Sequence, residues 1–174
     1  MLSAWNKLLE TPYRAGYRRM LKRAFETPDG RTVEFDIKDE GMPVCVLALT
    51  KTNHVVLAKQ FRPGPEKILM ELPGGGMEHG ETPTEAITRE LLEETGYSGK
   101  IQFVGTSLVS AYSTGIRYNF IATNCSRTHE PKNDENEFIE AIEMPLEEFK
   151  KHLRSGELTD VTTGYLGLVY LSLL

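Results

Sequence analysis

Residues 75–97 read GGMEHGETPTEAITRELLEETGY, a glycine-rich loop that leads into a segment with helical character. Thr82 is suited to cap a helix N-terminus, Pro83 fits the first helical position, and Glu85 falls at the third. These residues form the pattern of a capping box, in which the cap and the third residue bond to each other's backbone. The sequence therefore predicts a helix that begins at Pro83.

Glutamates are crowded onto this helix. At about 100° per residue, Glu90 and Glu94 lie roughly 40° apart around it, with Glu93 on their flank. Like charges at this spacing repel each other, and partial burial without a cation costs several kcal/mol. A hard divalent cation is a natural neutraliser, and ligands that are all oxygen favour Mg²⁺ or Mn²⁺ over zinc. The pattern thus indicates a site for Mg²⁺ or Mn²⁺ that also holds substrate phosphates.

One arginine, Arg89, belongs to the same cluster. It follows Glu85 by four residues and precedes Glu93 by four, so we expect its guanidinium to contact both carboxylates. The alternative for such a charged stretch is a solvated surface helix, because runs of charge usually face water.

The complete stretch favours the metal site, because it resembles the Nudix box. That pattern is a glycine, five residues, a glutamate, seven residues, and then R-E-apolar-x-E-E-x-G-apolar. The matching positions are Gly75, Glu81, Arg89, Glu90, Leu91, Glu93, Glu94, Gly96 and Tyr97. Every fixed position and both gap lengths match, and the one departure is Tyr97, where the family more often has an aliphatic residue.

The resemblance to Nudix hydrolases, over about residues 30–160, implies an α/β fold, an α/β/α sandwich with a mixed β-sheet. It implies an enzyme that cuts nucleoside diphosphates linked to another group, with Mg²⁺ or Mn²⁺ as cofactor. By this resemblance Glu90 and Glu94 would be the principal metal ligands and Glu93 a further ligand or base. The remaining site residues would be Glu81 as a supporting ligand, Arg89 orienting the carboxylates, and the carbonyl of Gly74 as another ligand.

The residues before the box resemble the subgroup of ADP-ribose or nucleoside-diphosphate-sugar pyrophosphatases. The resemblance rests on Gln60-Phe61-Arg62-Pro63 and Glu71-Leu72-Pro73-Gly74-Gly75. It implies that Arg62 contacts the substrate and that the catalytic base can come from a late acidic loop. Here the base candidates would be Glu135 and Glu137, and a solvated loop is the alternative.

Beyond the box, the subgroup usually has Ser-Pro-Gly, whereas this chain has Ser113-Thr114-Gly115, so the base and sugar of the substrate stay open. Tyr112 and Arg117 nearby are candidates for stacking on a base or contacting phosphate, and the alternative is that they cap a strand.

Two other functions remain open at this point. The same box occurs with removal of pyrophosphate from nucleoside triphosphates, dinucleoside polyphosphates or capped RNA. A nucleotide-binding module without catalysis is the non-enzyme alternative, and the complete set of glutamates speaks against it.

The composition is that of an ordinary globular protein, with 174 residues, 40% hydrophobic and 26% charged residues. The net charge, 20 minus 25 or −5, argues against broad nucleic-acid binding, and the Nudix resemblance implies a small-molecule nucleotide as partner. Cys45 and Cys125 show no disulfide framework, so we expect buried free thiols. No secretory segment or long apolar run is evident, which predicts a cytoplasmic protein without membrane insertion.

Residues 1–26 form a basic extension with interspersed apolar and aromatic residues. It could be an amphipathic targeting or membrane-surface helix. We favour a helix or strand extension that packs on the domain or on a second subunit, and assign the Nudix-like domain to residues 27–174. This extension and the apolar last helix predict a homodimer, which the subgroup resemblance also implies.

The remaining chain alternates strand and helix patterns. We expect strands at residues 31–38, 42–50, 55–61, 68–72, 101–111, 117–124 and 138–144, and helices at 145–153 and 160–174. This order predicts a mixed sheet covered by helices on both faces.

Overall fold

The structure is a computed structural model that describes residues 3–132 and 138–174. Its chain divides into two compact units. One contains the N-terminal segment up to Met42 together with Leu108–Ile116, and the other contains Pro43–Ser107 and Arg117–Leu174. The proposed base candidates Glu135 and Glu137 lie outside the described residues.

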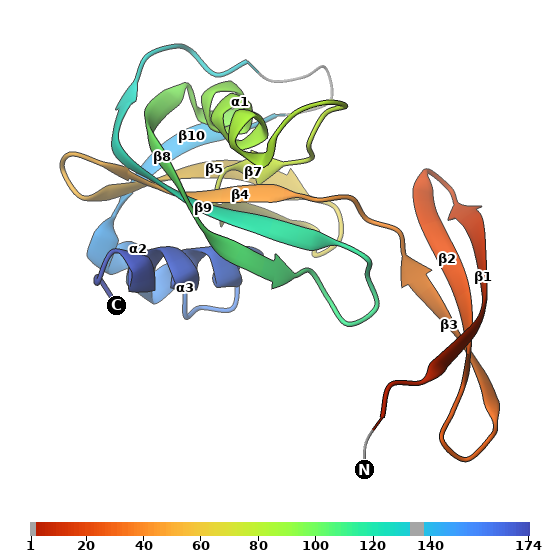
Figure 1. The fold of residues 1–174 in the computed structure, drawn as a ribbon. Coiled ribbons are helices and arrows are strands. Elements are labelled where there is room, and N and C mark those ends of the chain that lie inside the picture. Colours follow the sequence, from red (N-terminus) through yellow and green to blue (C-terminus); the bar gives the residue numbers. More distant parts are fainter. Residues whose placement is uncertain (1–2, 133–137) are drawn as a thin grey trace. The chain divides into compact units, whose positions relative to one another are not determined.

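The N-terminal unit is built on a three-stranded antiparallel sheet in the order β1-β2-β3 (Figure 1). The strands are β1 (Asn6–Ala15), β2 (Arg18–Glu26) and β3 (Thr32–Lys38). The basic extension therefore consists of strands rather than a helix. Because β3 pairs with β2, this compact unit runs further along the chain than the predicted extension of residues 1–26.

The larger unit contains a sheet whose central strands follow the order β10-β5-β4-β9-β8. In chain order they are β4 (Val44–Thr50), β5 (His54–Arg62), β8 (Tyr97–Leu108), β9 (Ile116–Arg127) and β10 (Glu140–Pro145). Strand β4 is parallel to β9 and antiparallel to β5, so the sheet is mixed. Two further strands join it: β6 (Lys67–Glu71) pairs with β5, and β7 (Gly74–Gly75) pairs with β4.

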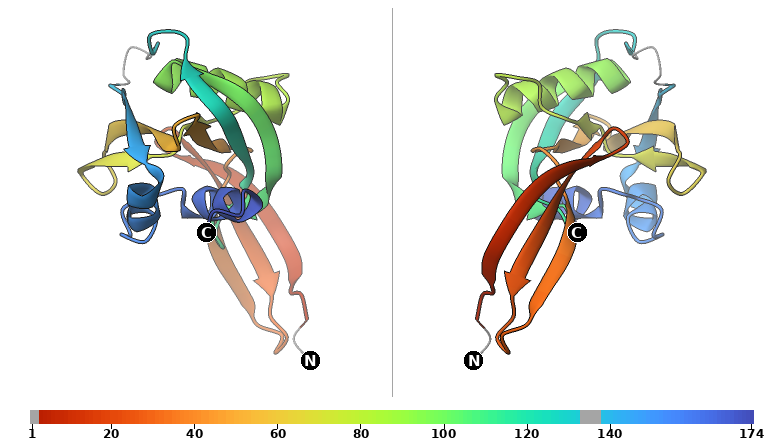
Figure 2. Two further views of the ribbon diagram at one scale, coloured as in Figure 1. Left: turned by 90° about the vertical axis from the view of Figure 1, so that its left-hand side faces the viewer. Right: turned by 90° about the vertical axis from the view of Figure 1, so that its right-hand side faces the viewer.

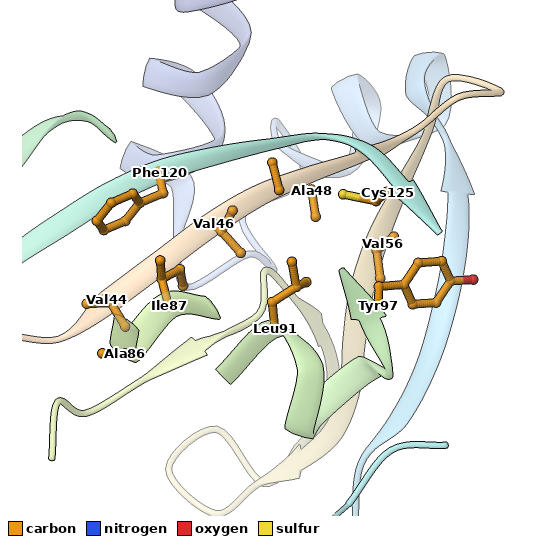
Figure 3. Packing of buried hydrophobic residues seen from close by; sticks show 11 residues of the cluster. Val44, Val46, Ala48, Val56, Ala86, Ile87, Leu91, Tyr97, Phe120 and Cys125 are labelled. Atoms are coloured by element: carbon orange, nitrogen blue, oxygen red, sulfur yellow. The ribbon is translucent and has the colours of Figure 1, made fainter. Parts of the chain in front are cut away.

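Helices cover both faces of this sheet, α1 (Pro83–Thr95) on one and α2 (Leu146–His152) with α3 (Val161–Tyr170) on the other (Figure 2). Strand β4 is buried throughout, and its side chains alternate between two cores, as the two-residue period of a strand requires. The α1 core contains Val44, Val46 and Ala48 with Ile87 and Leu91 (Figure 3). The other core contains Cys45, Leu47 and Leu49 with Phe149 and Leu168. The predicted α/β/α sandwich with a mixed sheet is confirmed.

Both cysteines are buried free thiols, as expected from the sequence. Within residues 3–132 and 138–174, no helix is long and apolar enough to cross a membrane.

Candidate active site

Helix α1 carries Arg89, Glu90, Glu93 and Glu94 of the candidate site, and its start is defined by a cap. The predicted capping box is present: the Thr82 backbone N–H donates to the Glu85 carboxylate at 2.8 Å, and the Glu85 N–H donates to the Thr82 hydroxyl at 3.3 Å. Pro83 occupies the first turn, where no backbone donor is needed. The helix therefore begins at a defined residue, which fixes the direction of the side chains that follow.

The end of α1 is defined by the glycine of the box. Gly96 adopts a left-handed conformation with φ of 74°, and its N–H donates to the Leu92 carbonyl at 2.8 Å. A Cβ at this position would lie 2.1 Å from the carbonyl oxygen of His129. Both the backbone conformation and the neighbouring chain thus require glycine here.

Arg89 is the hub of the acidic cluster. Its guanidinium donates to the Glu81 carboxylate at 2.8 and 3.1 Å, to Glu90 at 3.0 Å and to Glu93 at 3.0 Å. It also donates to the carbonyl of Gly76 at 3.0 Å, which ties the loop to the helix. The hydrogen bond with Glu81, followed by those with Glu93 and Glu90, raises the pKa of Arg89 far above its ordinary value. The guanidinium is therefore permanently charged.

Arg89 contacts Glu93 as expected, but the expected contact with Glu85 is wrong. Glu85 is engaged by the backbone and hydroxyl of Thr82, at 2.8 and 2.7 Å. Its place beside Arg89 is taken by Glu81 from the preceding loop. Hydrogen bonding to Arg89 lowers the pKa of Glu81, so this carboxylate is ionised at neutral pH.

Glu90 and Glu94 lie against the glycine loop of β7. The Glu94 carboxylate accepts a hydrogen bond from the Gly74 N–H at 2.9 Å. A Cβ on Gly75 would meet the Glu90 carboxylate at 2.5 to 2.7 Å, and one on Gly74 would lie 2.2 Å from the Val44 carbonyl oxygen. Only glycine therefore allows the loop and the two carboxylates to approach this closely.

The donor set suits a hard cation. Four carboxylates and one guanidinium give a formal charge of −4 + 1 = −3, and Glu90 and Glu94 are largely buried, with 14% of the Glu90 side chain and 9% of Glu94 exposed. Oxygen donors of this kind match Mg²⁺ or Mn²⁺. Across the described residues, no three acidic, histidine or cysteine side chains form a finished metal cage, and Arg89 binds three of the glutamates instead. The residues therefore fit a divalent ion that competes with Arg89 for the same oxygens.

The other predicted site residues are distributed over different parts of the structure. Arg62, at the end of β5, donates to the carboxylate of Glu71 and leaves 43% of its side chain exposed. Arg117 forms an ion pair of 2.9 Å with Asp160, the residue that precedes α3. Asn119, two residues further along β9, accepts a hydrogen bond from the Thr163 hydroxyl of α3. Side chains two residues apart on a strand point to the same face, so Arg117 lies on the face of the sheet that α3 covers.

Tyr112 belongs to the N-terminal unit, where its ring packs on Phe35 with a centroid distance of 6.0 Å. The structure thus brings Glu81, Arg89, Glu90, Glu93 and Glu94 together with Gly74, and it does not bring Arg117 into that cluster.

Tyr97, the one departure from the family pattern, is explained by its surroundings. Its ring is part of the α1 core, with 9% of the residue exposed, and its hydroxyl donates to the Glu143 carboxylate at 2.5 Å (Figure 3). An aliphatic residue would fill the same core but could not reach β10 with a polar group.

The sequence alone did not reveal a second buried polar group around Glu71, Thr159 and Asp160. The sequence gives one signal for it. Glu71 lies two residues after the apolar Leu69 in β6, so the two-residue period of a strand places Glu71 on the same buried face. The partners are 88 residues apart, and no local spacing relates them.

Comparison with known proteins agrees with this geometry. The sequence profile of the NUDIX domain matches residues 40–161. The ADP-ribose pyrophosphatase of Bacillus subtilis (strain 168) is 35% identical over 151 residues, which cover 85% of this chain and 81% of the relative. The methanol dehydrogenase activator of Bacillus methanolicus is 30% identical over 151 residues, with the same coverage of 85% and 81%.

A crystal structure described as an ADP compounds hydrolase has the same fold, with a TM-score of 0.83 at 19% identity, covering 99% of this chain and 96% of that one. The profile match includes the whole box, from Gly75 to Tyr97, and extends over most of the larger unit. The chain therefore belongs to the Nudix hydrolase family.

Proposed function

We propose that this protein hydrolyses the diphosphate bond of ADP-ribose or a related nucleoside diphosphate sugar, giving a nucleoside monophosphate and a sugar phosphate. The observation that carries this proposal is the acidic cluster held by Arg89 against the Gly74–Gly75 loop. The name of the Bacillus subtilis relative, ADP-ribose pyrophosphatase, supports the substrate class. Arg62, with 43% of its side chain exposed, would supply positive charge for the anionic substrate.

Mg²⁺, or Mn²⁺, is the proposed cofactor. Glu90 and Glu94 would be its principal ligands, with Glu81, Glu93 and the Gly74 carbonyl as further donors. When bound, such an ion would neutralise the charge of a diphosphate and would lower the pKa of a water molecule. The Gly74–Gly75 backbone holds the Glu94 and Glu90 carboxylates in place, and Arg89 limits their repulsion in the absence of substrate.

A general base must take a proton from the attacking water. Among the described residues Glu93 is suited to this role, because 43% of its side chain is exposed to solvent. Its carboxylate accepts a hydrogen bond from Arg89 at 3.0 Å, which orients it. Glu135 and Glu137 remain predicted candidates.

Arg62 is the proposed substrate contact. The Glu71 carboxylate behind it fixes the guanidinium while part of it faces solvent. Arg117 is more enclosed, with 20% of its side chain exposed, and its ion pair with Asp160 supports an indirect role. Tyr112, which is 58% exposed and packs on Phe35, stays a predicted contact for the base.

We further propose a homodimer in the cytoplasm. Strand β1 is exposed along its whole length, and among the described residues no strand pairs with its outer side. It carries exposed apolar side chains, Leu8, Leu9 and Tyr13, that a second copy would cover. The two buried free thiols suit a reducing compartment. Light scattering at micromolar concentration tests the dimer, and a monomer would contradict it.

A substrate panel with Mg²⁺ tests the reaction. It contains ADP-ribose, sugar diphosphates of other nucleosides, nucleoside triphosphates, dinucleoside polyphosphates and capped RNA. Release of a nucleoside monophosphate and a sugar phosphate supports the proposal. Release of pyrophosphate or cap products identifies the alternative Nudix reaction, and no turnover of any diphosphate-linked nucleotide contradicts both.

The name of the Bacillus methanolicus relative, methanol dehydrogenase activator, favours another candidate, activation of a dehydrogenase. Methanol dehydrogenase turnover, measured with and without this chain, tests it. An increase that persists with Glu94→Gln would indicate a binding function without hydrolysis, whereas an increase lost with that substitution would require the acidic cluster.

A further inference from the structure

Behind Arg62 lies a continuous chain of polar side chains that the reaction itself does not use. Arg62 donates to Glu71, and the hydroxyl of Thr159 contacts the other oxygen of the same carboxylate. Thr159 also contacts Asp160 at 3.1 Å, and Asp160 pairs with Arg117 at 2.9 Å. Two arginines are thus connected through two carboxylates and one hydroxyl.

The two carboxylates are deeply buried. Glu71 is 2% exposed and Asp160 is 9% exposed. Burying two carboxylates close together is unfavourable unless cations or shared protons reduce their repulsion. Arg62 pairs with Glu71 and Arg117 pairs with Asp160. The Thr159 hydroxyl lies between the two carboxylates and contacts both.

Thr159 contacts two carboxylates, and if both were ionised its single hydroxyl hydrogen could be donated to only one of them. A hydrogen bond with each carboxylate needs a proton on one of the two carboxyl groups. A threonine hydroxyl has a single hydrogen and can donate to only one acceptor at full strength. If it donates to Glu71, the remaining contact with Asp160 is favourable when Asp160 is protonated and donates to the threonine oxygen. The donor order then runs from Asp160 through Thr159 to Glu71, and on the other side Arg62 donates to Glu71.

The surroundings of Asp160 agree with this assignment. The groups that act on it are Arg117 of β9, Glu71 of β6 and Arg62 of β5, and it lies near the Cys45 thiol of β4. Burial is the largest influence and raises the pKa of Asp160, Glu71 raises it further, and the two arginines oppose the change. The hydrogen bond with Thr159 also lowers the pKa, and the net change is upward, the direction that a retained proton on Asp160 requires.

We infer that Thr159 and Asp160 are positioning residues: protonated Asp160 orients the Thr159 hydroxyl, which holds Glu71 as the ionised partner that fixes Arg62 for substrate binding. The group then contains two guanidinium charges and one carboxylate charge, 2 − 1 = +1, and this excess favours an anionic substrate at Arg62. The role of Arg62 rests on the proposed function, whereas the proton on Asp160 does not.

The first test measures the proton without using activity. Asp160→Asn replaces the protonated acid with an amide that can still donate to Thr159 and accept from Arg117. The pKa of Asp160 is raised in the folded protein, so wild-type stability is lost as pH rises from the unfolded value of about 4 toward the folded value. The asparagine amide does not titrate, so the stability of Asp160→Asn lacks this pH-dependent contribution.

Urea unfolding of both proteins near pH 5 and near pH 7.5 gives the required comparison. We expect the folding equilibrium constant of Asp160→Asn, relative to wild type, to rise by up to tenfold per pH unit over this range. A ratio that does not change with pH would overturn the proton assignment. This result is independent of whether any nucleotide is hydrolysed.

The second test measures positioning through steady-state kinetics on the nucleotide that the panel identifies. Thr159→Val removes the hydroxyl at similar volume, and we expect KM to rise about tenfold with a much smaller change in kcat. Thr159→Ser restores the hydroxyl and should rescue KM. Equal KM values for the valine and serine variants, with both folded by circular dichroism, would overturn the positioning role.

Absence of turnover in the wild-type protein would contradict the proposed function instead. In that case binding of ADP-ribose, followed by calorimetry, replaces KM as the measure of positioning. Equal affinity of the valine and serine variants would then overturn the positioning role.

Discussion

The Tyr97 hydroxyl donates a 2.5 Å hydrogen bond to the Glu143 carboxylate and so joins the first residue of strand β8 to strand β10. The Tyr97 ring belongs to the α1 core, and its hydroxyl is the polar end of an otherwise apolar contact (Figure 3). We expect Tyr97→Phe to lower the free energy of unfolding by about 1–3 kcal/mol, because a hydrogen bond to a charged acceptor is lost. Urea unfolding near pH 7 measures it, and a change below about 0.5 kcal/mol would contradict the assigned bond.

The same tyrosine predicts a pH dependence. Burial, together with the hydrogen bond to Glu143, raises the pKa of Tyr97 to about 12, against about 10 in the unfolded chain. The folded state therefore prefers the protonated phenol, and this contribution to stability is complete below pH 10 and is lost as pH rises toward 12. The stability difference between wild type and Tyr97→Phe should shrink between pH 8 and about pH 11. A constant difference would contradict it.

Arg89 provides a prediction about the acidic cluster. Arg89→Met removes the guanidinium and leaves Glu81, Glu90 and Glu93 to repel one another. We expect a loss of about 1–3 kcal/mol near pH 7.5, a smaller loss near pH 5 where the carboxylates can take up protons, and partial recovery on addition of Mg²⁺. Thermal unfolding at both pH values, with and without Mg²⁺, measures these effects.

The control for Arg89 is Arg154→Met, at an exposed position in the turn that follows α2. It removes the same charge away from the cluster. Equal losses in both variants, or no response of Arg89→Met to pH, would show that Arg89 does not offset carboxylate repulsion.

Helix α1 could be predicted closely because its signals are local. The cap at Thr82 and the stop at Gly96 are read directly from neighbouring residues, and the helix spans Pro83–Thr95. The predicted contact of Arg89 with Glu85 was wrong because the Glu85 carboxylate takes part in the capping box that was correctly predicted. Helical spacing identified possible partners of Arg89 but could not rank them against Glu81, which comes from the loop.

Long-range relationships could not be predicted. Glu71 meets Thr159 across 88 residues, and Tyr97 meets Glu143 across 46. Both contacts depend on how β6, β10 and the segment before α3 are brought together by the sheet, which no local pattern encodes. Arg117 is an example: no local pattern indicated its ion pair with Asp160, which comes from the segment before α3, and its contact with phosphate stays a prediction.

Gly75 offers a matched pair of glycine substitutions. A Cβ on Gly75 would meet the Glu90 carboxylate at 2.5 to 2.7 Å, whereas one on Gly76 would meet nothing within 4 Å. The carboxylate is the end of a flexible side chain, so it can move aside and the fold should persist. We expect Gly75→Ala to lower kcat by at least about tenfold with a stability change near 1 kcal/mol or less, and Gly76→Ala to retain stability. Equal activity of the two variants would contradict the close packing of Glu90 on the loop.

Glu94 separates catalysis from folding. In the wild-type protein the Gly74 N–H donates to the Glu94 carboxylate at 2.9 Å. Glu94→Gln keeps an oxygen that can accept this hydrogen bond but removes the negative charge available to a metal ion. We expect kcat with Mg²⁺ to fall by about a thousandfold or more, equivalent to at least about 4 kcal/mol of transition-state stabilisation, with unfolding changed by less than about 1 kcal/mol. Glu148→Gln, on the exposed side of α2, is the matched control and should leave both quantities unchanged. Turnover of Glu94→Gln at the wild-type rate would contradict the assignment of Glu94 as a principal metal ligand, because a carboxylate at this position would then have no part in the reaction.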